Sequence, residues 1–141
     1  MNNWLQQIAR QHQKNAISQT FVLTDEKTPD AILGFYSLAL RALIPRQNLP
    51  ASMAKKLPAN VPAITLARLA VQENQQGKGY GEELLVDAMR RTRTASKTVG
   101  GWALFVDAKD EHAAAFYQRY GFVALPSDSL VLLIPIACIP E

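Results

Sequence analysis

The stretch ITLARLAVQENQQGKGYG, residues 64–81, decides how the chain is expected to fold. Its opening run, residues 64–71, is apolar except for Thr65 and Arg68, which is typical of a buried strand. A short polar loop follows, and the glycine-rich end leads into residues with helical spacing. We therefore expect a strand, a loop and a helix in this order.

Gly77, Gly79 and Gly81 alternate with larger residues at the start of that helix. Small residues at a helix N-terminus leave backbone N–H groups uncovered. These donors and the positive end of the helix dipole favour phosphate oxygens. A phosphate-bearing ligand is therefore the first hypothesis. The alternative is that the glycines only let the helix pack close to the strand.

Two familiar phosphate loops fit this stretch poorly. The P-loop requires Ser or Thr after its Gly-Lys pair, whereas Lys78 is followed by Gly79. The dinucleotide-binding fingerprint is G-x-G-x-x-G with an acidic residue about twenty positions later. The stretch reads G-x-G-x-G and lacks that acidic residue. Neither motif is predicted here.

The register of Gln76, Gly79 and Gly81 after the apolar run resembles the acyl-coenzyme A loop, R/Q-x-x-G-x-G/A, of the GNAT superfamily of N-acetyltransferases. A second block, AFYQRYGF at residues 115–122, resembles another signature of that superfamily, a helix followed by a glycine turn and a strand. Two motifs in the right order and spacing are more specific than either alone. The resemblance covers residues 20–136.

This resemblance implies an α/β domain with a mixed central sheet flanked by helices, as alternating strands and helices also indicate. It implies acetyl-coenzyme A as co-substrate, with the pyrophosphate on the loop amides and the pantetheine arm beside the preceding strand. The coenzyme-binding residues expected from it are Leu69, Ala70, Val71, Gln76, Gly77, Lys78, Gly79, Tyr80 and Gly81.

Within the superfamily, the segments WLQQIARQHQKNAISQTFVL, ILGFYSLA, ARLAV, QGKGYG and AFYQRYGF resemble acetyltransferase toxins of bacterial type II toxin–antitoxin pairs. That resemblance implies acetylation of the α-amino group of aminoacyl-tRNA, which blocks translation, and neutralisation by a ribbon-helix-helix antitoxin. It also implies that Tyr117 is catalytic. From the residues alone, an aromatic packing face around Tyr117 is the competing interpretation. A homodimer is a candidate assembly.

Thioester chemistry gives partial independent support for an α-amine acceptor. An α-amino group has a pKa near 8 and is partly neutral at pH 7, whereas a lysine amine has a pKa near 10.4. Residues 64–71 supply no carboxylate as a base, although Glu73 and Asp107 stay open as candidates. Arg68 interrupts an apolar strand, so its charge must reach a groove or a partner. Arg68 and Arg90 are the expected tRNA contacts.

The rest of the chain is expected to form an N-terminal amphipathic helix, a hairpin, a proline-rich connection and further alternating elements. The superfamily normally begins with a strand before its first helix, so we expect the sheet to lack its first edge strand. Cys138 lies in an apolar run and is expected in the core. The expected ranges are a helix at 2–15, strands at 20–23 and 31–40, a loop at 41–62 with at most one short helix near 53–57, helices at 82–98 and 111–120, and strands at 102–106, 122–124 and 130–136.

Composition limits the remaining function classes. A chain of 141 residues, with 48% hydrophobic and 19% charged residues, is typical of one globular domain over residues 1–141. The net charge of +3 is weak evidence for a nucleic acid partner. A single cysteine excludes an internal disulfide, and no metal-ligand spacing is present. No leader or membrane-spanning run is seen, so we expect a cytoplasmic protein.

Two other functions stay open from the sequence. One is an acetyltransferase for a small amine or a protein N-terminus. The other is an acyl-coenzyme A binder or interaction module without catalytic activity.

Overall fold

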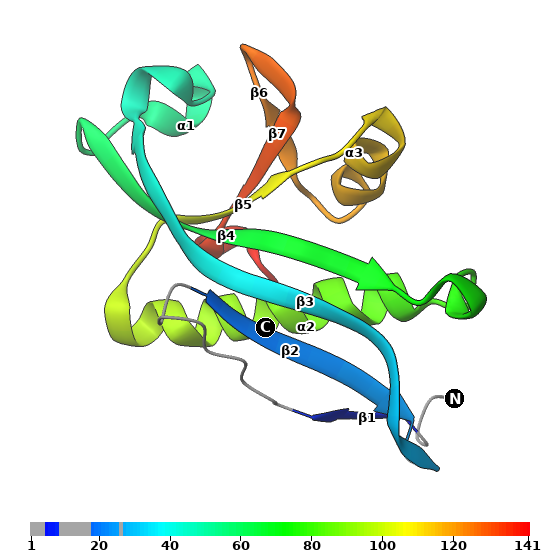
Figure 1. Cartoon of the computed structure of the whole chain (residues 1–141). Coiled ribbons are helices and arrows are strands. Elements are labelled where there is room, and N and C mark those ends of the chain that lie inside the picture. The colour runs from blue at the N-terminus through cyan, green and yellow to red at the C-terminus, as the bar shows by residue number, and fades with distance from the viewer. Residues whose placement is uncertain (1–4, 9–17, 26) are drawn as a thin grey trace. The chain divides into compact units, whose positions relative to one another are not determined.

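The computed structural model describes residues 5–8, 18–25 and 27–141 (Figure 1). The chain divides into two units, Met1–Ala39 with Leu66–Met89, and Leu40–Thr65 with Arg90–Glu141. The strands and helices are β1 (Leu5–Ile8), β2 (Ser18–Asp25), β3 (Thr28–Pro45), η1 (Arg46–Asn48), α1 (Ala51–Ala54), β4 (Asn60–Val71), η2 (Glu73–Gln75), α2 (Tyr80–Val99), β5 (Ala103–Asp107), α3 (Glu111–Gln118), β6 (Val123–Leu125), β7 (Asp128–Pro135) and η3 (Ile136–Cys138).

In the first unit the strands lie in the order β1-β2-β3-β4. β1 pairs antiparallel with β2, and β2 pairs antiparallel with β3, with Phe21 opposite Tyr36. The turn between β2 and β3 is held by the backbone N–H of Lys27, which donates to Asp25 Oδ1 at 2.9 Å. The predicted hairpin is therefore confirmed.

Aromatic and aliphatic side chains form the core of the first unit. The ring of Phe21 stacks on that of Tyr36 with the centroids 5.2 Å apart. Tyr36 is fully buried, and its hydroxyl donates to the carboxylate of Asp87 on α2, because a buried hydroxyl needs a partner. Leu84 and Leu85, in the same part of α2, are also buried. These contacts fix the first turns of α2 on the strands of this unit.

The N-terminal segment corrects two predictions. Residues 5–8 form the edge strand β1 instead of part of a helix, so the sheet has an edge strand beside β2 where none was expected. The rest of the predicted helix, at 2–4 and 9–15, lies outside the described residues. A short apolar pattern cannot distinguish a helix from a strand. The pairing supplies partners for N–H and C=O groups that β2 would otherwise leave exposed.

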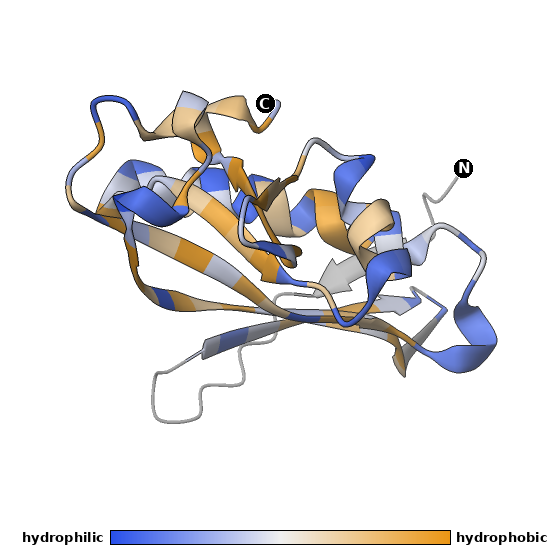
Figure 2. Ribbon diagram, turned by 90° about the horizontal axis from the view of Figure 1, so that it is seen from above, coloured by the Kyte–Doolittle hydropathy of each residue, from blue (hydrophilic) through white to orange (hydrophobic). Residues whose placement is uncertain are grey.

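In the second unit the strand order is β4-β5-β7-β6, with β5 and β6 both antiparallel to β7. β4 and β5 are neighbours joined through α2. Such a crossover is how parallel strands are connected, so the sheet is mixed, as predicted. β5 and β7 are almost continuously apolar, as the hydrophobic colours of Figure 2 show. Leu104, Phe105, Leu132 and Leu133 are fully buried.

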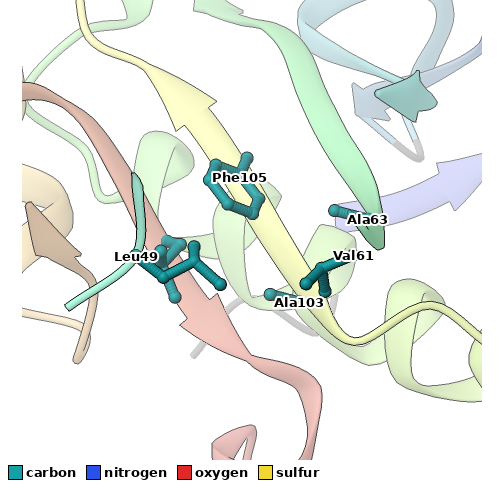
Figure 3. Close-up of a cluster of buried hydrophobic side chains, with 6 residues drawn as sticks. Leu49, Val61, Ala63, Ala103 and Phe105 are labelled. Atoms are coloured by element: carbon teal, nitrogen blue, oxygen red, sulfur yellow. The ribbon is translucent and has the colours of Figure 1, made fainter. Parts of the chain in front are cut away.

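The core of the second unit brings the connection after β3 onto the sheet. Leu49 belongs to one buried cluster with Phe105 of β5 and with Val61 and Ala63 of β4 (Figure 3). Burying a side chain such as Leu49, which is 3% exposed, contributes about 1.5–3 kcal/mol. The short helix allowed in the predicted loop at 41–62 is present as α1, at Ala51–Ala54. The loop itself is shorter than predicted, because β3 continues to Pro45 and β4 begins at Asn60.

The C-terminal segment is held by Arg93 of α2. Its guanidinium donates to the carbonyl oxygen of Ile139 at 2.6 Å and to Glu141 Oε2 at 2.9 Å. Cys138 is exposed, so the expectation of a core position is wrong. Residues three apart share one side of a 3₁₀ turn. Ile136 and Ile139 therefore occupy the buried side of η3, and Cys138 points outward.

Helix α2 runs from Tyr80 to Val99, slightly longer than predicted. Glu82 and Glu83 lie in its first turn and Lys97 in its last, an order that suits the helix dipole. Over the described ranges, none of the helices is long and apolar enough to cross a membrane. The same residues contain no cluster of three His, Cys, Asp or Glu side chains that could hold a metal ion.

Candidate functional site

The loop between β4 and α2 is shaped by two glycines with left-handed backbones. Gly77 and Gly79 both have φ of +83°, a conformation that L side chains rarely adopt. A Cβ added at either position would have no atom within 4 Å among the described residues. The glycines are therefore required by the path of the backbone, and close packing does not explain them.

A different glycine serves close packing in this unit. A Cβ on Gly34 of β3 would lie 2.8 Å from the carbonyl oxygen of Ala70 and 2.8 Å from Leu84 Cδ1. Gly34 thus lets β3, the end of β4 and α2 approach one another. The sequence interpretation that assigned this role to the loop glycines fits Gly34 instead, a residue that sequence reasoning did not single out.

The start of α2 presents unpaired backbone donors. The first hydrogen bond of the helix joins the N–H of Glu83 to the carbonyl oxygen of Gly79 at 3.1 Å. The N–H groups of Gly79, Tyr80, Gly81 and Glu82 precede it and have no partner within the helix. Because residue 79 is a glycine, no side chain caps them. This end of α2 can accept an anion.

Two exposed side chains fix the loop at its borders. Gln76 Nε2 donates to the carbonyl oxygen of Val71, the last residue of β4, at 3.3 Å. Lys78 Nζ donates to Gln75 Oε1 at 3.1 Å. Gln76 therefore ties the loop to the strand, and Lys78 places a cation beside the open donors.

A cavity of about 670 Å³ lies where the ends of β3 and β4 meet this loop. The backbone N–H of Gln72 donates to the carbonyl oxygen of Leu33 at 2.9 Å, which joins the two strands beside it. The walls of the cavity combine apolar, amide and carboxylate groups. They are formed by Ile32, Gly34, Phe35, Ala70, Val71, Gln72, Glu73 and Gln76.

Tyr80 and Glu83 are enclosed behind the first turn of α2. Tyr80 is 4% exposed, so it can offer a ligand its backbone N–H and not its ring. Burial raises the pKa of Tyr80, with smaller contributions from the charges of Asp25 and Glu83. Burial also raises the pKa of Glu83, whose Oε2 has no hydrogen-bond partner in the described part of the chain. Tyr80 is therefore buried and Glu83 half-buried, so neither side chain covers the backbone donors as an exposed group.

The predicted tRNA contacts are both exposed. Arg68 lies on β4 in the first unit, and Arg90 lies on α2 in the second. Neither side chain forms an ion pair with a residue that the structure describes. Both charges are therefore available to a partner.

Tyr117 lies in the last turn of α3, in the second unit. Asp110 starts this helix, because its Oδ1 accepts the N–H of Ala113 at 2.8 Å. The ring of Tyr117 is 8% exposed and meets Phe116 and Phe122 edge-on, with centroids 5.2 and 5.7 Å away.

Burial raises the pKa of the Tyr117 hydroxyl, so the group keeps its proton at neutral pH. Among the residues in the structure, none forms a hydrogen bond with this hydroxyl. The aromatic packing predicted as the competing interpretation is real. It also leaves a protonated hydroxyl free to donate.

Asp107, one of two candidate bases, is committed to an ion pair. Arg41 of β3 contacts both of its carboxylate oxygens at 2.9 Å and also donates to Thr65 Oγ1 at 3.1 Å. The guanidinium carbon lies 4.9 Å from the centroid of Phe105. The hydrogen bond from Arg41 lowers the pKa of Asp107 despite partial burial. An ionised carboxylate with both oxygens engaged is a poor general base at neutral pH.

The structure brings the expected coenzyme residues together in the first unit, from the end of β4 to the first turn of α2. Tyr117 and Arg90 belong to the second unit. The sequence analysis did not identify Arg41 as a site residue. No local pattern marks its pairing with Asp107, because the two residues are 66 positions apart in the chain.

The chain is similar to proteins with named roles. The acetyltransferase (GNAT) domain family matches residues 16–124. A tRNA-acetylating toxin of Mycobacterium tuberculosis is 37% identical over 103 residues, which cover 73% of this chain and 61% of that protein. A probable toxin TacT of Sinorhizobium fredii is 26% identical over 148 residues, covering 99% of this chain and 81% of that protein.

Solved structures agree with these matches. A mutant of KacT has a TM-score of 0.82 and 38% identity, over 89% of this chain and 75% of that one. AtaT complexed with acetyl-methionyl-tRNAfMet has a TM-score of 0.81 and 35% identity, over 89% and 75%. An AtaT mutant bound to acetyl-coenzyme A and to the C-terminus of the antitoxin AtaR has a TM-score of 0.72 and 31% identity, over 89% and 72%.

Proposed function

We propose, because this chain belongs to the acetyltransferase (GNAT) domain family, that it transfers the acetyl group of acetyl-coenzyme A to the α-amino group of aminoacyl-tRNA. Such a reaction blocks translation, so the chain would act as a toxin. The similarity to the tRNA-acetylating toxin and to AtaT, which has been solved with acetyl-methionyl-tRNAfMet, supports this substrate class.

The start of α2 is the single observation that carries the proposal. Four N–H groups that have no partner within the helix lie at the positive end of α2, next to Gly77 and Gly79, around which there is open space. That cradle suits the pyrophosphate of the coenzyme, with the end of β4 beside the pantetheine arm. The residues assigned to the coenzyme are Leu69, Ala70, Val71, Gln76, Gly77, Lys78, Gly79, Tyr80 and Gly81.

Tyr117 is proposed as the general acid. When the amine nitrogen attacks the carbonyl carbon, the C–S bond breaks and negative charge develops on the departing sulfur. A thiol has a pKa near 8.5, and a buried tyrosine with a pKa above its usual 10 stays protonated until it can donate. The amine loses its proton to solvent, and solvent returns a proton to Tyr117. The proposed route uses neither Glu73 nor Asp107, which is held by Arg41. An α-amine needs least help from a base.

The proposed partners follow from the same relatives. Arg68 and Arg90 are assigned to phosphates of the tRNA. The AtaT structure with an antitoxin segment supports an antitoxin as the neutralising partner, and we propose that this partner is of the ribbon-helix-helix class. A homodimer and a cytoplasmic location complete the proposal.

One experiment tests the substrate class directly. Purified chain is mixed with labelled acetyl-coenzyme A and total tRNA, either charged with amino acids or deacylated. Label is expected on the charged tRNA alone, and in the α-amide of the amino acid after the ester is hydrolysed. Turnover on polyamines or peptide N-termini with none on charged tRNA would contradict it.

A second function is favoured by one feature of the cavity. Glu73 and Phe35 are both on its wall, and a carboxylate beside an aromatic ring can hold a small cationic amine. An acetyltransferase for a small amine would lose activity in Glu73→Gln. The proposed tRNA reaction would not depend on that charge. Coenzyme binding without turnover on any amine would instead indicate a catalytically silent binder.

A further inference from the structure

A long part of the chain carries positive charge alone. Residues 31–72 contain no Asp or Glu, although the whole chain has 12 of them. The cations in that range are Arg41, Arg46, Lys55, Lys56 and Arg68. Exposed cations without a neighbouring carboxylate attract polyanions over a distance of several ångströms. Only those cations that have no partner within the described chain can bind such a polyanion.

The connection at residues 46–57, here called the basic platform, is fixed to the core of the second unit by its apolar side chains. Leu49 is buried in a cluster that includes Phe105 (Figure 3). Met53 and Leu57 pack against the same cluster. Arg46 closes the segment, because its backbone N–H donates to Ala59 O at 2.9 Å and its Nη1 to Leu57 O at 2.7 Å. Packing and hydrogen bonds therefore fix the backbone of the basic platform.

Lys55 and Lys56 are the free charges of the platform. Both are exposed, and neither forms an ion pair with any part of the chain that the structure describes. Arg41, by contrast, is neutralised by Asp107, and Arg46 holds the backbone of Leu57.

Lys56 occupies a position that favours a residue of another kind. It has φ of +69°, and no other residue except glycine has a positive φ in the described chain. After the end of a helix, such a backbone is usually supplied by Gly or Asn, because a larger side chain is strained there. A lysine at this position places its ammonium at a cost in backbone strain, which is typical of a functional position.

The platform has the chemistry of a phosphate contact and not of a protein interface. Protein interfaces depend on buried aromatic and aliphatic side chains. The apolar side chains of the platform are already used in the core. Its exposed surface consists of cationic, amide, hydroxyl and small side chains, which are the groups that contact phosphate and ribose. They are Arg46, Gln47, Asn48, Ala51, Ser52, Lys55 and Lys56.

We infer that the basic platform contacts the sugar–phosphate backbone of the tRNA, with Lys55 and Lys56 as its charged contacts. This inference rests on the proposed function and adds a substrate-binding surface to Arg68 and Arg90. The contacts are to the backbone, so they add affinity without selecting the amino acid or the base sequence.

The test compares three variants of the full chain for binding to charged tRNA by fluorescence anisotropy over a range of salt. Lys55→Gln with Lys56→Asn removes two charges, and Asn tolerates the left-handed backbone. Lys55→Arg with Lys56→Arg keeps the charges. Lys27→Gln with Lys97→Gln is the matched control, because it removes two exposed charges elsewhere.

The neutral pair is expected to bind tRNA more weakly and to flatten the slope of log K against log salt by roughly 1.4 to 1.8, the value for two phosphate contacts. The arginine pair and the control pair should stay close to wild type. Affinity for acetyl-coenzyme A should be equal in all three, and thermal melts should show that each is folded.

The outcomes separate this inference from the proposed function. A wild-type chain that neither binds nor acetylates charged tRNA contradicts the proposed function. A wild-type chain that acetylates tRNA, with the neutral pair keeping its affinity and slope, overturns the platform alone. Equal losses in the neutral and control pairs also overturn it, because the effect would then be one of net charge. Loss of binding to an acidic peptide in the neutral pair, with binding to tRNA kept, would also overturn the inference.

Discussion

The loop at residues 76–81 and helix α3 carry the two proposed halves of the chemistry by opposite means. The loop offers backbone N–H groups from exposed glycines, around which there is open space. Helix α3 offers one hydroxyl on a buried ring held by Phe116 and Phe122. A backbone site is damaged by adding atoms, whereas a side-chain site is damaged by removing one. That difference can be tested at each place by a single substitution.

The largest effect is expected at Gly79. Gly79→Asp adds a carboxylate beside the proposed pyrophosphate, and two like charges about 4 Å apart repel by about 4 kcal/mol near a protein surface. Affinity for acetyl-coenzyme A should fall about 10³-fold by calorimetry. Gly79→Asn is the control, because it has the same size and tolerates a positive φ. Equal affinities in folded Asp and Asn variants would remove the phosphate from this loop.

The next effect concerns a single oxygen atom on α3. Tyr117→Phe keeps the ring contacts with Phe116 and Phe122 and removes the proposed proton donor. Acetyl transfer measured in single turnovers should fall roughly 10²-fold or more, while coenzyme affinity and melting temperature stay the same. Tyr120→Phe, in the same aromatic cluster, serves as the control and should keep most of the activity. Normal single-turnover rates in Tyr117→Phe would assign the tyrosine to packing only.

A smaller effect separates the two kinds of glycine in the first unit. Gly34→Ala places a methyl group 2.8 Å from the carbonyl oxygen of Ala70 and from Leu84 Cδ1. Overpacking of this kind costs about 1–3 kcal/mol in the free energy of unfolding, measurable by urea titration. Combining it with Leu84→Val removes one of the two clashing groups, so the double variant should lose less than the sum of the single losses. Additive losses would show that the contact with Leu84 is unimportant.

The parts of the site that could be predicted from the sequence are those that depend on local rules. A left-handed backbone favours glycine, so the spacing of Gly77 and Gly79 marked the loop. The helix expected at 111–120 begins at Glu111 and ends at Gln118. Residues 5–8 gave too short a pattern to distinguish a strand from a helix. Their conformation is decided by pairing with β2, which is a tertiary effect.

Other features of the site could not be predicted because their causes lie far apart in the chain. Gly34 is small because Ala70 and Leu84 approach it. The residues that neighbour Gly34 in the sequence do not predict this close contact. The pairing of Arg41 with Asp107 likewise appears only when β3 and β5 are folded, and it changes the assignment of Asp107 from candidate base to fixed anion.

The smallest expected effect tests that assignment through pH. Arg41 lowers the pKa of Asp107 in the folded chain, so the folded state favours the ionised form more than the unfolded state does. The stabilisation is therefore present above the unfolded pKa of about 3.9 and is lost as the pH falls through the lower, folded value. The Asp107 side chain is 62% exposed, so solvent screening limits the gain to at most about 1 kcal/mol. Asp107→Asn should reduce the free energy of unfolding by that amount from pH 5 to 8, and the difference from wild type should vanish toward pH 2. Acetyl transfer, measured at pH 7 to 9, should keep the same pH profile in both proteins, because a carboxylate bound to Arg41 takes no proton from the amine. If Asp107→Asn loses activity at pH 7 and recovers it at higher pH, Asp107 would again be the candidate base.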